Sequence, residues 1–292
     1  MLIFEVLTPG PLTSVQDLGR YGYTHLGVSQ TGAMDEYAYR WTQKLLGNTE
    51  GNALEILLSG LKLKTLNPCT IAVCGADLGF CINGQEKDIW CTHHIQKGDI
   101  LSFEKNVSGL RAYLAVKGGF SLDKIQGSYA YSSKENKGLK VEKGTLLTYA
   151  ESQTRDLRRV PKVHIPLYSK VLSLNILLDT NASPAILENS YTLSPQINAM
   201  GYKLQGKPLT SSKGGIISEG IAFGAVQVPT DGQPIILLKE RQSIGGYENL
   251  GTVLAKDCFA LAQAPIGATV SFKAITIKEA QEEMKDFYRF FS

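Results

Sequence analysis

Several features that define common protein classes are absent from this sequence of 292 residues. No window approaches the about 18 consecutive apolar residues that a membrane-spanning helix requires. Charge is nearly balanced, with 30 Lys and Arg against 27 Asp and Glu, and the basic residues form no long run. Because nucleic-acid and membrane surfaces attract concentrated basic patches, we expect neither as a partner.

Cysteine and histidine are also scarce. The five cysteines are odd in number and most lie in apolar runs, which predicts reduced core thiols and no disulfide framework. His93 and His94 are adjacent and would point to opposite faces of a strand. Cys91 and His93 can share a face, but they lack a third ligand, so no metal is predicted. The opening MLIFEVLTPGPL has no basic segment of a secretory signal, and a cytoplasmic location is expected.

Two common catalytic or cofactor motifs are missing. No GxxxxGK[ST] loop is present, so no Walker-type ATP site is predicted in this chain. The segments 27–32 and 214–220 do not have the GxSxG spacing of a nucleophile elbow, and neither has an obvious His partner. Ala199-Met200 starts like a biotinylation sequence, but Gly201-Tyr202 follows, and covalent biotin is not expected.

The segments that are present favour a mainly β fold. Short apolar runs separated by Gly, Asn, Asp or Lys fill residues 53–150, which is typical of an antiparallel barrel or sandwich. A helix is predicted over 34–46 with Asp35 as its cap, and a last helix begins at a capping box of Thr276 and Glu279. The length and the charged, proline-containing segment 151–168 predict an N-terminal domain, 1–155, and a C-terminal domain, 156–292.

The stretch 220–247 concentrates unusual chemistry. It predicts a strand over 225–228 that carries Gln227, a Pro/Asp/Gly turn, and a return strand over 234–238. Arg241 follows this hairpin, and the Gly245-Gly246 step after it permits a close backbone approach. The stretch is either the wall of a pocket or an ordinary hairpin with a polar tip.

The candidate binding residues are amide, carboxylate and guanidinium side chains beside glycine turns, together with the Gly-Gly-Tyr step. They are Gln16, Asp17, Arg20, Asp35, Glu55, Gln227, Arg241, Gln242, Gly245, Gly246 and Tyr247. Arg suits a bidentate grip on a carboxylate, and Gln matches both edges of an amide, so the set suits a small lactam or amide bearing a carboxylate. The structural alternative is that Asp35 caps a helix, Glu55 pairs with a Lys, and Asp17 and Arg20 form a loop salt bridge. No catalytic residue is assigned.

Two long segments resemble one family. QDLGRYGYTHLGVSQTGAMDEYAYRWTQKLLGN, residues 16–48, and SEGIAFGAVQVPTDGQPIILLKERQSIGGY, residues 218–247, are similar to the KipA-like proteins, also called 5-oxoprolinase C subunits or allophanate hydrolase subunit 2. Shorter similar segments cover 53–60, 98–103, 109–119 and 261–272. The resemblance implies two cyclophilin-like antiparallel β-barrel halves with a few short helices.

The resemblance also implies a function. It implies a non-autonomous subunit that acts with a KipI-like and a LamB/YcsF-type partner in a bacterial ATP-dependent 5-oxoprolinase, a lactam hydrolase that opens 5-oxoproline to glutamate. One alternative is a regulatory protein that antagonises the KipI-like partner. Another is the carboxyltransferase part of a biotin-dependent urea or amide carboxylase, and only this alternative involves biotin.

The chain departs from the family pattern at arginine positions. Asn198-Ala199-Met200-Gly201 stands where many relatives have Asp-Arg-Met-Gly, and the segment 127–133 lacks the arginine of a Gly-Ser-Arg-Ser-Thr-like run. Fewer arginines predict weaker binding of an anionic substrate or a phosphorylated intermediate, and hence a different substrate or a regulatory role.

Overall fold

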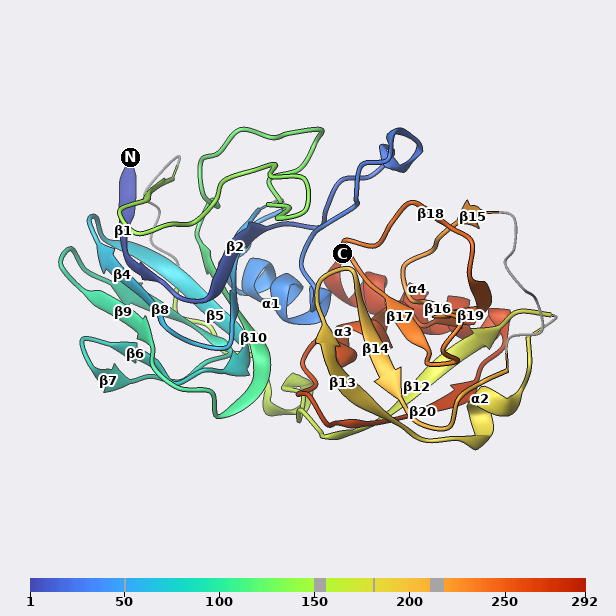
Figure 1. Ribbon diagram of the computed structural model, residues 1–292. Helices are drawn as coiled ribbons and strands as arrows, with labels where there is room; N and C mark the ends of the chain where they lie inside the picture. The colour runs from blue at the N-terminus through green and yellow to red at the C-terminus, as the bar shows by residue number, and fades with distance from the viewer. Residues whose placement is uncertain (50, 150–155, 181, 211–217) are drawn as a thin grey trace. The chain divides into compact units, whose positions relative to one another are not determined.

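A computed structural model describes residues 1–49, 51–149, 156–180, 182–210 and 218–292 (Figure 1). These residues form two compact units. Unit 1 comprises Met1–Arg20 and Thr31–Tyr168, and unit 2 comprises Tyr21–Gln30 and Ser169–Ser292. The predicted domain boundary falls at residue 155, outside the described residues, so the division into 1–155 and 156–292 stays a prediction. Most of the segment 214–220 also lies outside them.

Unit 1 is built from two sheets. The six-stranded sheet has the order β11-β1-β4-β9-β6-β7, and the five-stranded sheet has the order β2-β3-β10-β5-β8. Its strands are β1 Leu2–Pro9, β2 Leu12–Gln16, β3 Ala53–Leu57, β4 Leu61–Thr65, β5 Cys69–Asp77, β6 Phe80–Ile82, β7 Gln85–Glu86, β8 Cys91–Ile95, β9 Ile100–Phe103, β10 Ser108–Val116 and β11 Leu146–Thr148. A short 3-10 helix, η2, spans Lys162–His164.

The burial of individual strands follows from what covers their faces. In β4, Leu61, Leu63 and Thr65 are buried while Lys62 and Lys64 are exposed, as expected for a strand with one face on a core. In β5, eight of the nine residues are buried. Helix α1, Glu36–Leu46, packs against β5 and β10, which explains why these strands bury both faces.

Helix α1 has the predicted cap and the predicted end, and it begins at Glu36, slightly later than the sequence predicts. The Asp35 side chain accepts a hydrogen bond from the backbone N–H of Ala38 at 3.1 Å, which confirms the predicted cap. Glu36 and Arg40 form an ion pair at 2.8 Å one turn apart. Gly47 ends the helix in the left-handed region, at φ 61°, where a side chain is disfavoured.

Unit 2 is a closed barrel with the order β12-β19-β16-β17-β14-β13-β20, and a separate pair of strands, β15 and β18, lies beside it (Figure 1). Its strands are β12 Val171–Leu178, β13 Tyr191–Ile197, β14 Gly201–Gln205, β15 Glu219–Gly220, β16 Ala225–Val228, β17 Ile235–Leu237, β18 Ile244–Gly245, β19 Glu248–Val253 and β20 Thr269–Ala274. The neighbours β12 and β20 run parallel, and the other neighbouring strands in the barrel run antiparallel. Together with unit 1, the barrel confirms the predicted mainly β fold with few helices.

The helices of unit 2 are short except for the last one. They are η1 Thr24–Leu26, α2 Ala185–Glu188, α3 Ala255–Leu261 and α4 Ile277–Phe291. The predicted capping box of α4 is confirmed: Glu279 N–H donates to Thr276 Oγ1 at 3.3 Å, and Thr276 N–H donates to the Glu279 carboxylate at 2.9 Å. Phe287 of α4 packs on Phe259 of α3 with ring centroids 5.6 Å apart. Among the helices in the described part of the chain, none is long and apolar enough to cross a membrane.

The predicted hairpin over 225–238 is also confirmed. Strands β16 and β17 pair antiparallel, with Val226 opposite Ile236 and Gln227 opposite Ile235. Gly232 takes φ 73° in the connecting turn, and a Cβ there would lie 2.7 Å from the carbonyl oxygen of Leu209, so both conformation and space require glycine. All four residues of β16 are buried, which places the Gln227 amide in the interior of the unit.

Candidate functional site

The structure divides the predicted binding residues between the two units. Gln16, Asp17, Arg20, Asp35 and Glu55 belong to unit 1, whereas Gln227, Arg241, Gln242, Gly245, Gly246 and Tyr247 belong to unit 2. The two groups are therefore two separate candidate sites.

In unit 1, the Asp17 carboxylate holds a loop. Its Oδ1 accepts hydrogen bonds from Gly19 N–H and from Ser128 Oγ, both at 2.7 Å, and its Oδ2 accepts from Tyr129 N–H at 2.7 Å. Within the described residues these are all of its hydrogen bonds, so the salt bridge anticipated between Asp17 and Arg20 does not form. The reason is that the nearby hydroxyl and N–H donors occupy both carboxylate oxygens.

Arg20 also binds residues of the loop that Asp17 contacts. Arg20 is 1% exposed, and its guanidinium donates to the carbonyl oxygens of Ile125, at 3.2 Å, and of Ala130, and to Thr31 Oγ1 at 2.7 Å. A buried guanidinium whose donors face carbonyl oxygens stabilises the chain path. The positions of Asp17 and Arg20 thus favour a structural role.

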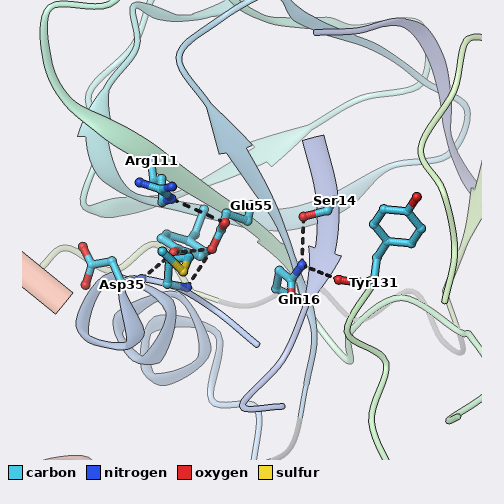
Figure 2. A network of polar contacts seen from close by, with 8 residues as sticks. Ser14, Gln16, Asp35, Glu55, Arg111 and Tyr131 are labelled. Carbon is cyan, nitrogen blue, oxygen red and sulfur yellow. Dashed lines mark hydrogen bonds and ion pairs between the residues drawn. The ribbon is translucent and has the colours of Figure 1, made fainter. Parts of the chain in front are cut away.

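Gln16 lies nearby and keeps one polar atom unused. Its Nε2 donates to Ser14 Oγ at 2.9 Å and to the carbonyl oxygen of Tyr131 at 3.0 Å (Figure 2). Its Oε1 is buried and has no hydrogen-bond partner among the described residues. The Gln16 amide therefore keeps one buried acceptor that no described residue of unit 1 uses.

A second network in unit 1 joins Asp35 and Glu55 through Tyr113, a residue that the sequence did not single out. The Tyr113 hydroxyl donates to Glu55 Oε2 at 2.6 Å and accepts from Asp35 N–H at 2.8 Å, while Met34 N–H donates to the same Glu55 oxygen at 2.9 Å (Figure 2). Burial, and then the neighbouring Glu55 and Asp35, raise the pKa of Tyr113, which keeps its hydroxyl protonated as a donor.

This network fixes the start of α1. Glu55 faces Arg111 at 3.6 Å, in place of the Lys partner anticipated from the sequence, because Arg111 lies on the adjacent strand β10 (Figure 2). The Tyr168 hydroxyl is 3.5 Å from Asp35 Oδ2. Asp35 thus caps the helix as predicted, and Glu55 orders the residues that lead into it.

In unit 2, Gln227 is one of the buried polar residues. Gln227 is 2% exposed, yet its side chain makes no hydrogen bond with the residues the structure describes. The carboxamide lies against Gly245 of β18: a Cβ on that glycine would be 3.0 Å from Gln227 Nε2 and 2.6 Å from Ile221 Cδ1. Because buried amides are normally satisfied, this one is well suited to a ligand that supplies a donor and an acceptor.

Arg241 binds the backbone of Ile221, the residue whose side chain lies beside Gly245. Its Nε donates to the carbonyl oxygen of Ile221 at 3.0 Å, its Nη1 to that of Leu238 at 3.2 Å, and its Nη2 to Gln30 Oε1 at 3.3 Å. Gln30 comes from the segment Tyr21–Gln30, which belongs to unit 2 although unit 1 flanks it in sequence. Sequence reasoning missed Gln30, since nothing local in the sequence marks it as a partner of Arg241.

The remaining candidates of unit 2 border this site. Gln242 and Gly246 are half-buried, and Tyr247 is exposed. Across the described ranges, neither Gln242 nor Tyr247 uses its side chain in a hydrogen bond. Their roles in binding stay predictions.

The turn that departs from the family pattern also lies here. Glu240 N–H donates to the carbonyl oxygen of Ala199, and Leu238 N–H to that of Met200, both at 2.8 Å. Asn198 Oδ1 closes the turn by accepting from Met200 N–H at 2.8 Å. Ala199 thus occupies a position beside the strand end that leads to Arg241, and it contributes no second guanidinium there.

No group of three or more His, Cys, Asp or Glu side chains suited to a metal is found within the described ranges. Cys91 Sγ lies 3.4 Å from His93 Nε2, and that nitrogen is 2.8 Å from the carbonyl oxygen of Asp88. Burial raises the pKa of Cys91 and lowers that of His93, so both side chains favour the neutral form. The pair is therefore a poor candidate for a nucleophile.

Comparison with known proteins gives a consistent picture. Residues 26–274 match the family described as carboxyltransferase domain, subdomain A and B. The chain is 31% identical over 288 residues to the 5-oxoprolinase C subunit of Haemophilus influenzae, with 95% of this chain and 93% of that protein covered. It is 29% identical to the protein of the same name from Escherichia coli, with 99% and 96% covered.

A solved structure extends the likeness to larger proteins. The crystal structure of the urea amidolyase of K. lactis matches with a TM-score of 0.93 at 25% identity, covering 99% of this chain. This chain spans 20% of the length of that protein.

Proposed function

Because the chain belongs to the carboxyltransferase domain family, subdomains A and B, we propose that it is the C-type subunit of an ATP-dependent 5-oxoprolinase complex. In this proposal it acts with a KipI-like and a LamB/YcsF-type subunit to open 5-oxoproline to glutamate. In this proposal the chain is a non-autonomous subunit, and the complex uses ATP.

The observation that carries this proposal is the length of the similarity. At 31% identity the alignment covers 95% of this chain and 93% of the Haemophilus influenzae 5-oxoprolinase C subunit. The similarity therefore extends over most of both sequences. The unsatisfied carboxamide of Gln227 adds support, since a lactam presents the N–H and carbonyl that a carboxamide can match.

The test is reconstitution. The chain is co-expressed with a KipI-like and a LamB/YcsF-type protein from the same genome, and glutamate release from 5-oxoproline is measured with and without ATP. We expect turnover only with all three proteins and ATP. The absence of turnover, while a 5-oxoprolinase complex assembled from related subunits is active in the same assay, would reject the proposal.

A second candidate is favoured by the match to urea amidolyase at a TM-score of 0.93. In this alternative the chain is the carboxyltransferase part of a biotin-dependent urea or amide carboxylase. It predicts that the chain and its partner consume free carboxybiotin in the presence of urea or another amide. Stable binding of a KipI-like partner without turnover in either assay would favour the regulatory alternative.

A further inference from the structure

The guanidinium of Arg241 is held entirely by neutral acceptors among the described residues. The carbonyl oxygens of Ile221 and Leu238 and the amide oxygen of Gln30 accept one hydrogen bond each from Nε, Nη1 and Nη2. Each terminal nitrogen carries two N–H groups, so one on Nη1 and one on Nη2 remain without an acceptor in the described part of the chain. A carboxylate grips arginine through two such N–H groups.

The surroundings of Arg241 supply no counter-ion within the described ranges, since no carboxylate there forms an ion pair with it. Burial lowers the pKa of Arg241, and Tyr21 and Cys258 act against that shift. The Phe223 ring lies 5.9 Å from the guanidinium carbon and 4.8 Å from Lys239 Nζ, which brings a second cation to the same ring. A half-buried cation without a counter-ion is a favourable place for a bound anion.

Ile221 links this cation to the unsatisfied carboxamide. Its carbonyl oxygen accepts from Arg241, and its side chain lies over Gly245 beside the amide of Gln227. The guanidinium therefore contacts Ile221, and the Gln227 carboxamide and the Ile221 side chain both lie next to Gly245. Together the guanidinium and the carboxamide offer one group for a carboxylate and another for an amide.

We propose that Arg241 binds the carboxylate of a small ligand in unit 2, and that Gln30 is a positioning residue that orients the guanidinium for it. Gln30 holds Nη2 from a segment that reaches unit 2 from an early part of the chain, so the site forms only when that segment is in place. The proposal rests on the proposed function for the choice of ligand alone. It places carboxylate binding in this chain without help from its partners.

The experiment compares two ligands that differ in one group. Ligand-observed NMR titrations of the complete chain measure the dissociation constants of 5-oxoproline and of 2-pyrrolidinone, the same lactam without its carboxylate. The unmodified chain is expected to bind 5-oxoproline about tenfold more tightly. In Gln30→Glu the new carboxylate lies against Arg241 and competes with the ligand, so affinity for 5-oxoproline falls about tenfold while affinity for 2-pyrrolidinone is unchanged.

Two further variants test whether the loss of affinity in Gln30→Glu comes from Arg241 and not from the added negative charge alone. Gln196→Glu makes the same change at an exposed position of β13 and is expected to keep the preference. Arg241→Lys keeps the charge but removes the planar fork, and should reduce the preference. Equal binding of the two ligands by the unmodified chain, or binding of neither, overturns the carboxylate site.

A separate result tests the role of Gln30. An unchanged preference in Gln30→Glu rejects Gln30 as a positioning residue. Failure of the reconstituted complex to turn over 5-oxoproline, with the ligand preference intact, rejects the proposed function and leaves the carboxylate site standing.

Discussion

Arg241 Nη2 donates to Gln30 Oε1 at 3.3 Å, although 211 positions separate the two residues in the sequence. The contact ties the segment Tyr21–Gln30 to the rest of unit 2, while the residues on both sides of that segment belong to unit 1. The chain therefore passes into unit 2 twice, and the proposed binding site of that unit combines residues from an early and a late segment. A site of this kind depends on the fold of the whole chain.

Gly245 is expected to be required for ligand binding. In Gly245→Ala the Cβ would lie 2.6 Å from Ile221 Cδ1 and 3.0 Å from Gln227 Nε2, so both side chains must move. Because these atoms are side-chain ends, we expect a loss of about 1 kcal/mol in unfolding free energy, with a larger effect on ligand affinity. Urea unfolding and ligand titration measure the two effects.

Gly220 provides the matched control for that substitution. It lies on β15, opposite Ile244 of β18, and a Cβ there meets no described atom within 4 Å. Gly220→Ala should therefore leave affinity unchanged. If both variants bind ligand equally well, ligand binding does not depend on the position of the Gln227 carboxamide beside Gly245.

The Tyr113 hydroxyl is expected to stabilise unit 1. Tyr113→Phe removes a donor from the Glu55 carboxylate and an acceptor from Asp35 N–H, leaving buried polar groups unsatisfied. We expect the unfolding free energy to fall by about 1–3 kcal/mol. Tyr149→Phe is the control, since among the described residues that buried hydroxyl has only the Met1 sulfur at 3.7 Å, a weak acceptor. Equal losses in both variants would contradict the importance of the network.

The cysteines are expected to differ in reactivity. Burial raises the pKa of Cys69 to about 12 and raises the pKa of Cys74, Cys91 and Cys258 as well, so little thiolate forms. Cys81 is half-buried, and its pKa is also raised. Iodoacetamide at about pH 8 should modify Cys81 first, because access then decides the order. Peptide mass spectrometry reads this order, and the chain unfolded in guanidinium should label at all five cysteines.

The sequence predicted the local parts of this structure. Hairpin β16–β17, the Asp35 cap and the capping box of α4 depend on residues within a few positions of one another, and periodicity and side-chain chemistry define them. The closeness of Gln227 to Gly245 followed for the same reason, since both lie within one short stretch. Their role in binding ligand stays a prediction.

Long-range partners were not predictable in the same way. Tyr113 meets Glu55 because β10 and β3 pair in one particular register, and the sequence does not fix that register. Asp17 and Arg20 looked like a loop ion pair, but the carboxylate binds Ser128 and Tyr129, and the guanidinium binds carbonyl oxygens more than 100 positions away. Both outcomes depend on how distant segments pack.

Two aspartates of unit 2 are expected to change stability with pH in opposite directions. Burial raises the pKa of Asp257 above its ordinary value of 3.8, against hydrogen bonds from Asn175. The folded state then binds the proton more tightly, so this contribution is present at low pH and is lost as pH rises through the raised pKa. The ion pair with Lys203 at 2.5 Å lowers the pKa of Asp231 below 3.8. Its contribution is present above 3.8 and is lost as pH falls.

The two directions can be distinguished by urea unfolding between about pH 3 and 7. The unfolding free energy is measured for the unmodified chain, for Asp257→Asn and for Asp231→Asn. The stability of the unmodified chain relative to Asp257→Asn should decrease as pH rises from 3.8, because only the unmodified chain must then charge a buried carboxyl group. Relative to Asp231→Asn, it should instead increase with pH over the acidic part of the range, as the ion pair with Lys203 forms. Curves that shift in the same direction for both variants would show that burial does not dominate at Asp257.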